Sequence, residues 1–217
     1  MKILVFGASR GTGLLCVERA LALGHSVVAV SRNADTIAVN HESLTKLNGD
    51  FNNKESVTQA VKQVVPDAVI ISVGAKSLKI FKDNPNFFSA GTECVISALR
   101  TCAPNARLVI LSAMGTKTSG TRQNYPWILR TFLLDWILAG PFDDHERQEE
   151  MVKASGLNWT IALPSGLTDY PASGKSLRET DPTKRVPLWI ARADVAQFLV
   201  EACTSLEWQG KSVTLGG

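Results

Sequence analysis

The sequence has few of the residues from which metal sites and disulfide frameworks are built. Its 217 residues include three histidines, at His25, His41 and His145, and they form no ligand pattern. There are four cysteines and no C-x-x-C pair, and no cysteine spacing suits zinc. Each cysteine has an apolar or helical context, where free cysteine behaves as a small core hydrophobe. We therefore expect no metal site, and we expect reduced core cysteines at Cys16, Cys94, Cys102 and Cys203.

Long apolar runs and strong net charge are also missing. No apolar run approaches the ~20 residues of a membrane span. One lysine before the short apolar run of residues 3–6 is not typical of a signal peptide. The net charge of +3 is mild and lacks the clustered basic residues of a nucleic-acid-binding protein. The expectation is a cytoplasmic protein with neither a membrane nor a nucleic-acid partner.

What is present is the composition of an ordinary globular chain, because 45% of the residues are hydrophobic and 20% are charged. Short apolar runs alternate with helix-length segments, which is typical of βαβ units. The sequence predicts an α/β fold in one domain, residues 1–217: a Rossmann-type, doubly wound parallel sheet with helices on both faces. The expected strands are residues 3–6, 26–30, 43–47, 68–73, 107–111, 159–163 and 212–215. The expected helices are residues 12–23, 54–64, 86–102, 143–154 and 193–203.

Two segments fit this pattern less well. Residues 165–190 contain prolines and glycines, and we expect a small irregular substrate region packed over the carboxyl edge of the sheet. Residues 127–138 are apolar nearly all round, so such a helix must be buried somewhere. It could be sheet core, a lid over a substrate pocket or a partner-binding face. Pro126 before it and Gly140-Pro141 after it favour the lid or the interface.

A glycine-rich loop directly follows the first expected strand. It reads Gly7-Ala8-Ser9-Arg10-Gly11-Thr12-Gly13 and opens an amphipathic helix. In such loops the glycines allow a tight turn, backbone approach to a pyrophosphate, and close packing of helix on strand. The helix adds free N–H groups and the positive end of its dipole. A plain turn is the alternative, but the position between two strands predicts dinucleotide binding.

The residue after the second strand indicates which dinucleotide. NAD enzymes usually place an acid there for the ribose 2′-hydroxyl, whereas an arginine accommodates a 2′-phosphate. Here Arg32 lies 19 residues beyond Gly13, and Arg10 in the loop could reach the same phosphate. Guanidinium groups grip phosphate bidentately. Two solvated surface arginines are the alternative, and Asp35 is better suited to capping a helix. The predicted cofactor is NADP(H).

With these residues the chain resembles the atypical short-chain dehydrogenase/reductases, the NAD(P)H-binding group related to NmrA. It is most similar to the biliverdin IXβ reductase/flavin reductase branch. The last of the matching stretches is the most specific. They are GASRGTG at 7–13, SRN at 31–33, GDF at 49–51, DAVIISVGA at 67–75, LVILSAMG at 108–115 and DDHERQEEMVKASGLNWTIALPSGLTD at 143–169.

The resemblance implies a set of cofactor contacts. For the pyrophosphate loop they are Gly7, Ser9, Arg10, Gly11, Thr12 and Gly13. Arg32 would contact the 2′-phosphate, and Asp50 and Phe51 the adenine side. Gly74 would lie beside the nicotinamide ribose, and the residues near the nicotinamide would be Ser112, Pro164 and Ser165. That branch often has a second arginine four residues after Arg32, where this chain has Thr36. Either Arg10 provides the second contact to the 2′-phosphate, or the preference for NADP(H) over NAD(H) is weaker than in that branch.

Many short-chain dehydrogenases carry a Tyr-x-x-x-Lys pair, in which the lysine lowers the tyrosine pKa for proton transfer. In this chain Pro141 and His145 stand at the corresponding positions, and the reductase branch likewise has a histidine there. The catalytic candidates are Ser112 and His145. Ser112 could instead cap the following segment, and the sequence reveals no base beside it. For His145 a solvated helix start is the favoured interpretation.

Two functions remain open at this stage. The first is an NADPH-dependent reductase that passes hydride to a planar small molecule such as a flavin, quinone or tetrapyrrole. Such acceptors take hydride with little help from a protein acid. The second is a non-catalytic NADP(H)-binding redox sensor of the NmrA type, which controls a partner. The reductase is favoured, and the expected oligomeric state is a monomer or a weak homodimer.

Overall fold

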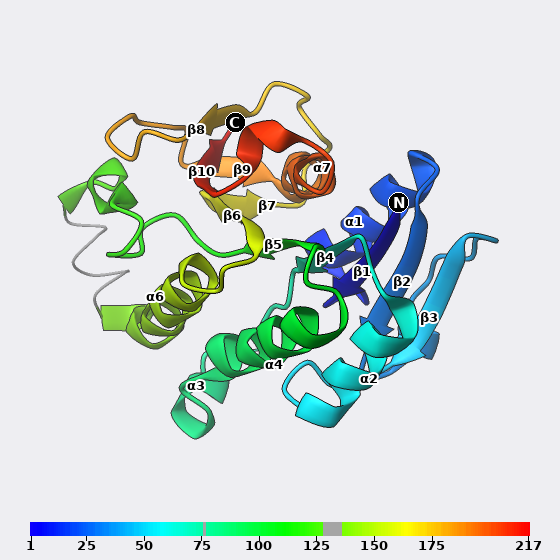
Figure 1. Cartoon of the computed structure of the whole chain (residues 1–217). Helices are drawn as coiled ribbons and strands as arrows, with labels where there is room; N and C mark the ends of the chain where they lie inside the picture. The colour runs from blue at the N-terminus through cyan, green and yellow to red at the C-terminus, as the bar shows by residue number, and fades with distance from the viewer. Residues whose placement is uncertain (76, 128–135) are drawn as a thin grey trace.

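In the computed structural model of the chain, residues 1–75, 77–127 and 136–217 are described. A central eight-stranded sheet has the order β3-β2-β1-β4-β5-β6-β10-β8 (Figure 1). All neighbours in it pair in parallel, except β8, which runs antiparallel to β10 at the edge. Its strands are β1 (Lys2–Phe6), β2 (Ser26–Ser31), β3 (Leu44–Asn48), β4 (Ala68–Ile71), β5 (Arg107–Leu111), β6 (Asn158–Pro164), β8 (Leu177–Glu179) and β10 (Lys211–Gly216). This arrangement confirms the predicted Rossmann-type fold.

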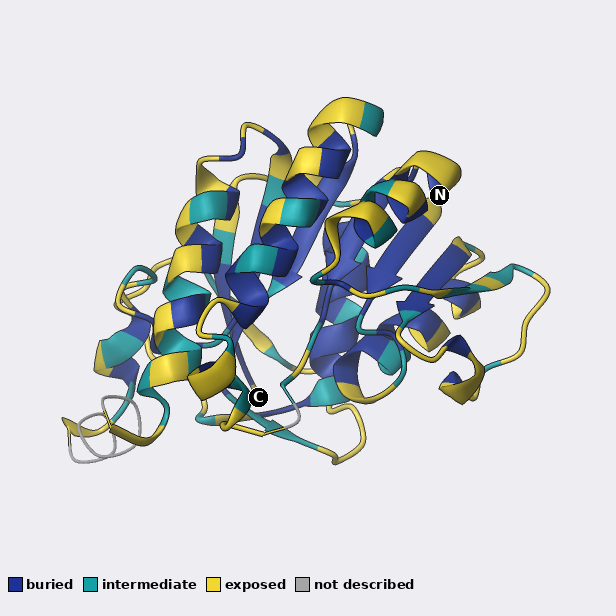
Figure 2. Ribbon diagram, turned by 90° about the horizontal axis from the view of Figure 1, so that it is seen from below, coloured by how far each residue is buried: buried dark blue, intermediate teal, exposed yellow. Residues whose placement is uncertain are grey.

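Helices cover both faces of the sheet. The buried side chains of β1 alternate between the two faces of the sheet: Ile3 and Val5 join the core under α1 and α7. Leu4 and Phe6 join the core under the opposite helices. Figure 2 shows the strands buried between helices whose outer faces are exposed. The helices are α1 (Gly11–Ala22) and α7 (Arg192–Ala202) on one face, and α2 (Lys54–Val64), α4 (Phe87–Cys102) and α6 (Ala139–Lys153) on the other.

The strand order places a crevice between β1 and β4. From β1 the chain winds outward through β2 to β3, and then returns to the other side of β1 as β4. In doubly wound sheets ligands bind at such a switch point, outside the carboxyl ends of the strands. Gly7 and Ser72 follow β1 and β4 at this point, and the amide of Ser72 donates to the carbonyl of Phe6 (3.0 Å). The two loops that frame the crevice are therefore joined at its base.

The region expected to be irregular contains short strands. β7 (Gly166–Thr168) pairs in parallel with β9 (Trp189–Ala191) as a separate two-stranded sheet. Single-sequence periodicity does not resolve three-residue strands, which explains the difference. Short helical elements that were also not expected are α3 (Ile80–Asp83) and the 3₁₀ helices η1 (Ala34–Thr36), η2 (Thr121–Asn124) and η4 (Leu206–Trp208).

Two other expectations concern the middle of the chain. α6 begins at Ala139 rather than at residue 143. Pro141 lies in its first turn, where a missing N–H costs nothing. Most of the apolar segment expected at residues 127–138 lies outside the described residues; Trp127 and Trp136 at its ends are exposed. Among the described helices, none is long and apolar enough to cross a membrane.

Candidate functional site

The glycine loop after β1 adopts a conformation that only glycine allows. Gly7 has a φ of 85°, and a Cβ there would lie 2.3 Å from the carbonyl oxygen of Ser72. A Cβ at Gly13 would lie 2.2 Å from the carbonyl oxygen of Gly7. The first glycine thus permits the turn, and the third lets α1 press against the loop. The N-terminus of α1, which has no acidic residue in its first turn, is left facing the crevice with free N–H groups.

A cavity of about 500 Å³ lies over the crevice. It extends from the end of β2, past the glycine loop, to the ends of β4 and β5. Most of the residues expected to hold a cofactor line it together. They are Gly7, Ser9, Arg10, Gly11, Thr12, Arg32, Asp50, Phe51 and Gly74.

The charges at the β2 end of this cavity suit an anion. Arg10 and Arg32 are both exposed side chains of the lining. No acid stands directly after β2, where Ser31 precedes Arg32. An arginine fork binds phosphate through two parallel N–H bonds. Asp50, farther along the lining, accepts the amide of Asn52 (2.9 Å) and so shapes its own turn.

Phe51 has a packing role in addition to any ligand contact. Its ring lies 5.8 Å from that of Phe6. A Cβ at Gly91 of α4 would lie 2.1 Å from the Phe51 ring. The residue is buried and holds the loop after β3 against α4. A loss of binding on its replacement would therefore report packing as well as contact.

Sequence reasoning missed several lining residues, among them Ser72, Leu167, Asp169 and Arg192. Ser72 was hidden because residues 68–73 read as one strand, whereas β4 ends at Ile71. Arg192 opens α7, and its Nε lies 3.7 Å from where a Gly11 Cβ would stand. The same Nε is 3.4 Å from Asp169 Oδ1. The sequence feature that could have indicated Arg192 is its position directly after the apolar triplet Trp189–Ala191, which forms β9.

Buried polar atoms without partners test whether a dinucleotide fits. Ser72 Oγ, Ser165 Oγ and Arg192 Nη1 are buried and have no hydrogen-bond partner. Such atoms are rare in native proteins unless a water or ligand satisfies them. All three are placed at the carboxyl edge of the sheet, after β4, after β6 and at the start of α7. Hydroxyl and guanidinium donors there fit a ligand rich in phosphate and ribose oxygens.

Other expected site residues lie beside the cavity rather than in its lining. Ser112, Pro164 and Ser165 follow or end the neighbouring strands β5 and β6. The amide of Ser112 donates to the carbonyl of Ala162, and that of Met114 to Pro164 (both 2.9 Å). Gly13 lies behind the loop, in the packing role described above.

A base stands next to Ser112 that the sequence did not reveal. Ser112 Oγ donates to Glu149 Oε1 of α6 at 2.6 Å. Glu149 has no solvent exposure. Burial raises the pKa of this carboxyl group, while hydrogen bonds from Ser112, Thr118 and Thr116 oppose the shift. The charged run of residues 143–150 concealed it, because a glutamate in such a run looks like a solvated one.

His145 does not line the cavity, and the expectation of a solvated helix start is wrong for it. Because α6 begins at Ala139, His145 lies within the helix. Its ring stacks on that of Phe88 (centroids 4.3 Å apart, planes at 16°). Its Nδ1 is 3.0 Å from Gln148 Oε1. Burial lowers the pKa of His145, while Gln148 and Asp144 oppose the shift.

This environment predicts an acid-sensitive fold. The folded pKa of His145 lies below the ordinary 6.5, so below about pH 6.5 the unfolded chain binds more protons than the folded one. The free energy of unfolding should therefore fall as the pH drops from 7 towards the folded pKa. Urea unfolding at pH 7.5, 6.5 and 5.5 measures this, and His145→Gln should lose less stability over that range than wild type. Equal losses in both proteins would contradict the assignment.

Comparison with known proteins places the chain in a family. Residues 7–205 match the NAD(P)H-binding family. An uncharacterized oxidoreductase of Schizosaccharomyces pombe is 42% identical over 202 residues, covering 83% of this chain. The chain spans 65% of the length of that relative.

Solved structures have the same fold at low identity. A short-chain dehydrogenase/reductase from Veillonella parvula, in complex with NADP, has a TM-score of 0.80 at 16% identity, covering 100% of this chain and 94% of its own. ChuY, an anaerobilin reductase from Escherichia coli O157:H7, has a TM-score of 0.78 at 22% identity, covering 100% and 97%. The family match confirms the expected dinucleotide cofactor and the expected NAD(P)H-binding family. The chain belongs to the NAD(P)H-binding family.

Proposed function

We propose that the protein is an NADPH-dependent reductase that passes hydride to a planar small molecule such as a flavin, a quinone or a tetrapyrrole. The observation that carries the proposal is the cavity itself, which is lined both by the glycine loop, including Arg10, and by Arg32 after β2. The oxidoreductase relative supports the reductase class. The anaerobilin reductase fold neighbour supports a tetrapyrrole-like acceptor.

Each part of the cavity has a task in this proposal. The α1 N-terminus with Ser9 and Thr12 holds the pyrophosphate, and Arg32 with Arg10 holds the 2′-phosphate. Asp50 and Phe51 border the adenine. Gly74 in the cavity lining and, beside the cavity, Ser112, Pro164 and Ser165 border the nicotinamide and its ribose. Bound NADPH supplies the hydride from its nicotinamide ring.

The site is suited to orienting the nicotinamide and the acceptor rather than to supplying a proton from a strong acid. Pro141 and His145 stand where a Tyr-Lys pair would be, and the His145 ring is stacked on Phe88. The proton of the Ser112 hydroxyl is donated to Glu149, which makes Ser112 a poor obligatory proton donor. An electron-poor acceptor that takes its proton from solvent after the hydride suits such a site. Holding the reactants in line then provides most of the rate.

Turnover with a panel of acceptors tests the proposal. NADPH oxidation is followed at 340 nm with FMN, a quinone and biliverdin offered in turn. We expect saturable oxidation with at least one of them. Tight NADP(H) binding without turnover on any acceptor would instead favour a redox-sensing regulator of the NmrA type.

The cofactor preference gives a separate prediction. Arg32→Ala should weaken NADPH binding by about 1.5–3 kcal/mol, the range for hydrogen bonds to charged groups, and should change NADH binding little. Isothermal titration of both cofactors measures it. Arg19→Ala, an exposed arginine of α1 outside the cavity, is the matched control. Equal losses for NADPH and NADH would refute a 2′-phosphate contact.

A further inference from the structure

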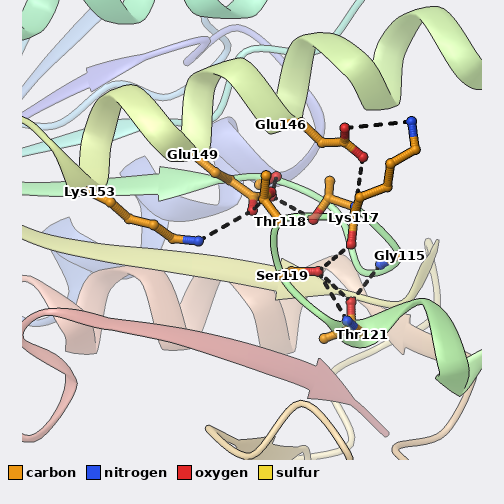
Figure 3. Close-up of polar contacts among 10 residues, drawn as sticks. Gly115, Lys117, Thr118, Ser119, Thr121, Glu146, Glu149 and Lys153 are labelled. Atoms are coloured by element: carbon orange, nitrogen blue, oxygen red, sulfur yellow. Dashed lines mark hydrogen bonds and ion pairs between the residues drawn. The ribbon is translucent and has the colours of Figure 1, made fainter.

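Glu149 is the centre of a buried polar cluster that the proposed reaction does not use directly. We call it the Glu149 cluster: Glu149, Lys153 and the hydroxyls of Ser112, Thr116 and Thr118. Oε1 accepts from Ser112 Oγ (2.6 Å) and Thr116 Oγ1 (3.0 Å). Oε2 accepts from Thr118 Oγ1 (2.8 Å) and lies 3.9 Å from Lys153 Nζ. Figure 3 shows Glu149 reaching from α6 to Thr118 on one side and Lys153 on the other.

The proton count in this cluster is fixed by chemistry. An ionised carboxylate only accepts hydrogen bonds and has about four lone-pair sites, whereas a hydroxyl has one proton and two lone pairs. The three hydroxyls each donate to one of those sites, and the Lys153 ammonium, 3.9 Å from Oε2, adds an attraction between opposite charges. Ser112 therefore points its single proton at Glu149. Towards any other group it presents lone pairs alone.

The same cluster fixes the loop that follows β5. Thr116 and Thr118 tie this loop to Glu149, and the amide of Lys117 donates to Glu146 Oε1 of α6 (2.6 Å). Farther along the loop, the amide of Gly115 donates to Thr121 Oγ1 (2.8 Å), as Figure 3 shows. Ser112 thus lies between the end of β5 and a loop that is anchored on α6. Its Oγ has little freedom to turn.

We propose that Glu149 is a positioning residue that makes Ser112 a hydrogen-bond acceptor for the carboxamide N–H of the bound nicotinamide. The inference rests on the proposed function, which puts Ser112 beside that ring. Ser112 is buried and lies next to Pro164 and Ser165 at the edge where the nicotinamide is proposed to bind. A ligand with an N–H donor there satisfies the lone pairs, and a ligand without one leaves them unpaired in a buried place. The pair would select the carboxamide without taking part in proton transfer.

A cofactor analogue tests this by affinity, independently of turnover. 3-Acetylpyridine adenine dinucleotide phosphate keeps the carbonyl but replaces the amide NH₂ with a methyl group. Isothermal titration gives the ratio of its Kd to that of NADP⁺. Wild type should prefer NADP⁺ by about fivefold to tenfold, the effect of one hydrogen bond to a buried group. Ser112→Ala should abolish the preference, and Ser112→Thr, which keeps the hydroxyl, should retain it.

Variants of the carboxylate test the role of Glu149. Glu149→Gln can turn its NH₂ towards Ser112, which frees the Ser112 proton to point outward, so the preference should shrink. Thr118→Val is the matched control, because it removes another hydrogen bond to Glu149 and leaves the Ser112 contact in place. It should keep the wild-type ratio. Should Glu149→Gln fail to fold, Glu149→Asp, which draws the carboxylate away from Ser112, should show the same loss of preference.

The outcomes separate this inference from the proposed function. A wild-type protein that binds both dinucleotides equally, or an unchanged ratio in Ser112→Ala, would overturn the inference while leaving reductase activity possible. A ratio unchanged in the foldable Glu149 variant would overturn the role of Glu149. Failure of wild type to bind NADP⁺ at all would overturn the proposed function itself.

Discussion

Asp144→Ala is expected to lower the free energy of unfolding by about 2–4 kcal/mol, as expected when a buried, hydrogen-bonded charge is removed. The Asp144 side chain is fully buried on α6. It accepts the amides of Phe88 (2.6 Å) and Ser89 (3.2 Å) and the hydroxyl of Ser89 (2.6 Å). These groups belong to the first turn of α4, whose preceding residue Asn86 provides no side-chain cap. Without Asp144, free N–H groups at that helix end would be buried unpaired.

Urea unfolding followed by circular dichroism measures the loss. Asp143→Ala is the control, because the neighbouring carboxylate is half exposed and 3.5 Å from Lys117, and exposed pairs contribute about 0–1 kcal/mol. A loss in Asp144→Ala no larger than in Asp143→Ala would show that the cap across helices contributes little.

Gly13→Ala is expected to have the second large effect, on stability and on cofactor affinity together. Its Cβ would lie 2.2 Å from the carbonyl oxygen of Gly7 and 2.8 Å from its carbonyl carbon. Backbone atoms cannot rotate away, so α1 must shift from the glycine loop. Overpacking of this kind costs about 1–3 kcal/mol or more. The same shift moves the helix N-terminus from the pyrophosphate site, and NADPH affinity should fall by at least about tenfold, or ~1.4 kcal/mol.

Thermal unfolding and NADPH titration of the variant check both effects. Gly74→Ala is the control for stability, since a Cβ at Gly74 would meet nothing within 4 Å. It should unfold close to the wild-type temperature. A Gly13→Ala protein with wild-type stability and affinity would contradict the close packing of α1 on the loop.

Local sequence patterns were sufficient to predict much of the fold and of the cofactor site. The inner strands β1, β2, β4 and β5 are largely apolar on both faces. Such runs, separated by segments with helical periodicity, predict a parallel sheet with covered faces. The glycine loop and Arg32 were predictable for a similar reason. Each lies at a fixed distance from a strand end, and the required residue type follows from sterics or charge.

The remaining features depend on contacts between distant segments. Glu149 meets Ser112 across 37 positions in the chain, and nothing local distinguishes it from the exposed Glu150. The charged residues around His145 favour a solvated side chain. Its ring instead stacks on Phe88, which belongs to another helix and which no local pattern connects to His145. Arg192, which lines the cavity, directly follows β9, and β9 is held by its pairing with the distant β7. Tertiary packing decides such environments, and one sequence does not encode them locally.

The central claim is that this cavity delivers hydride from NADPH to an acceptor, and one rapid-mixing measurement tests it most directly. Stoichiometric protein and NADPH, unlabelled or deuterated at either face of nicotinamide C4, are mixed with an acceptor that supports turnover or, failing that, with each acceptor of the panel. The account predicts that the 340 nm absorbance decays together with reduction of the acceptor, and more slowly when one face, and only that face, carries deuterium. NADPH that binds tightly and is not oxidised by any acceptor would contradict it.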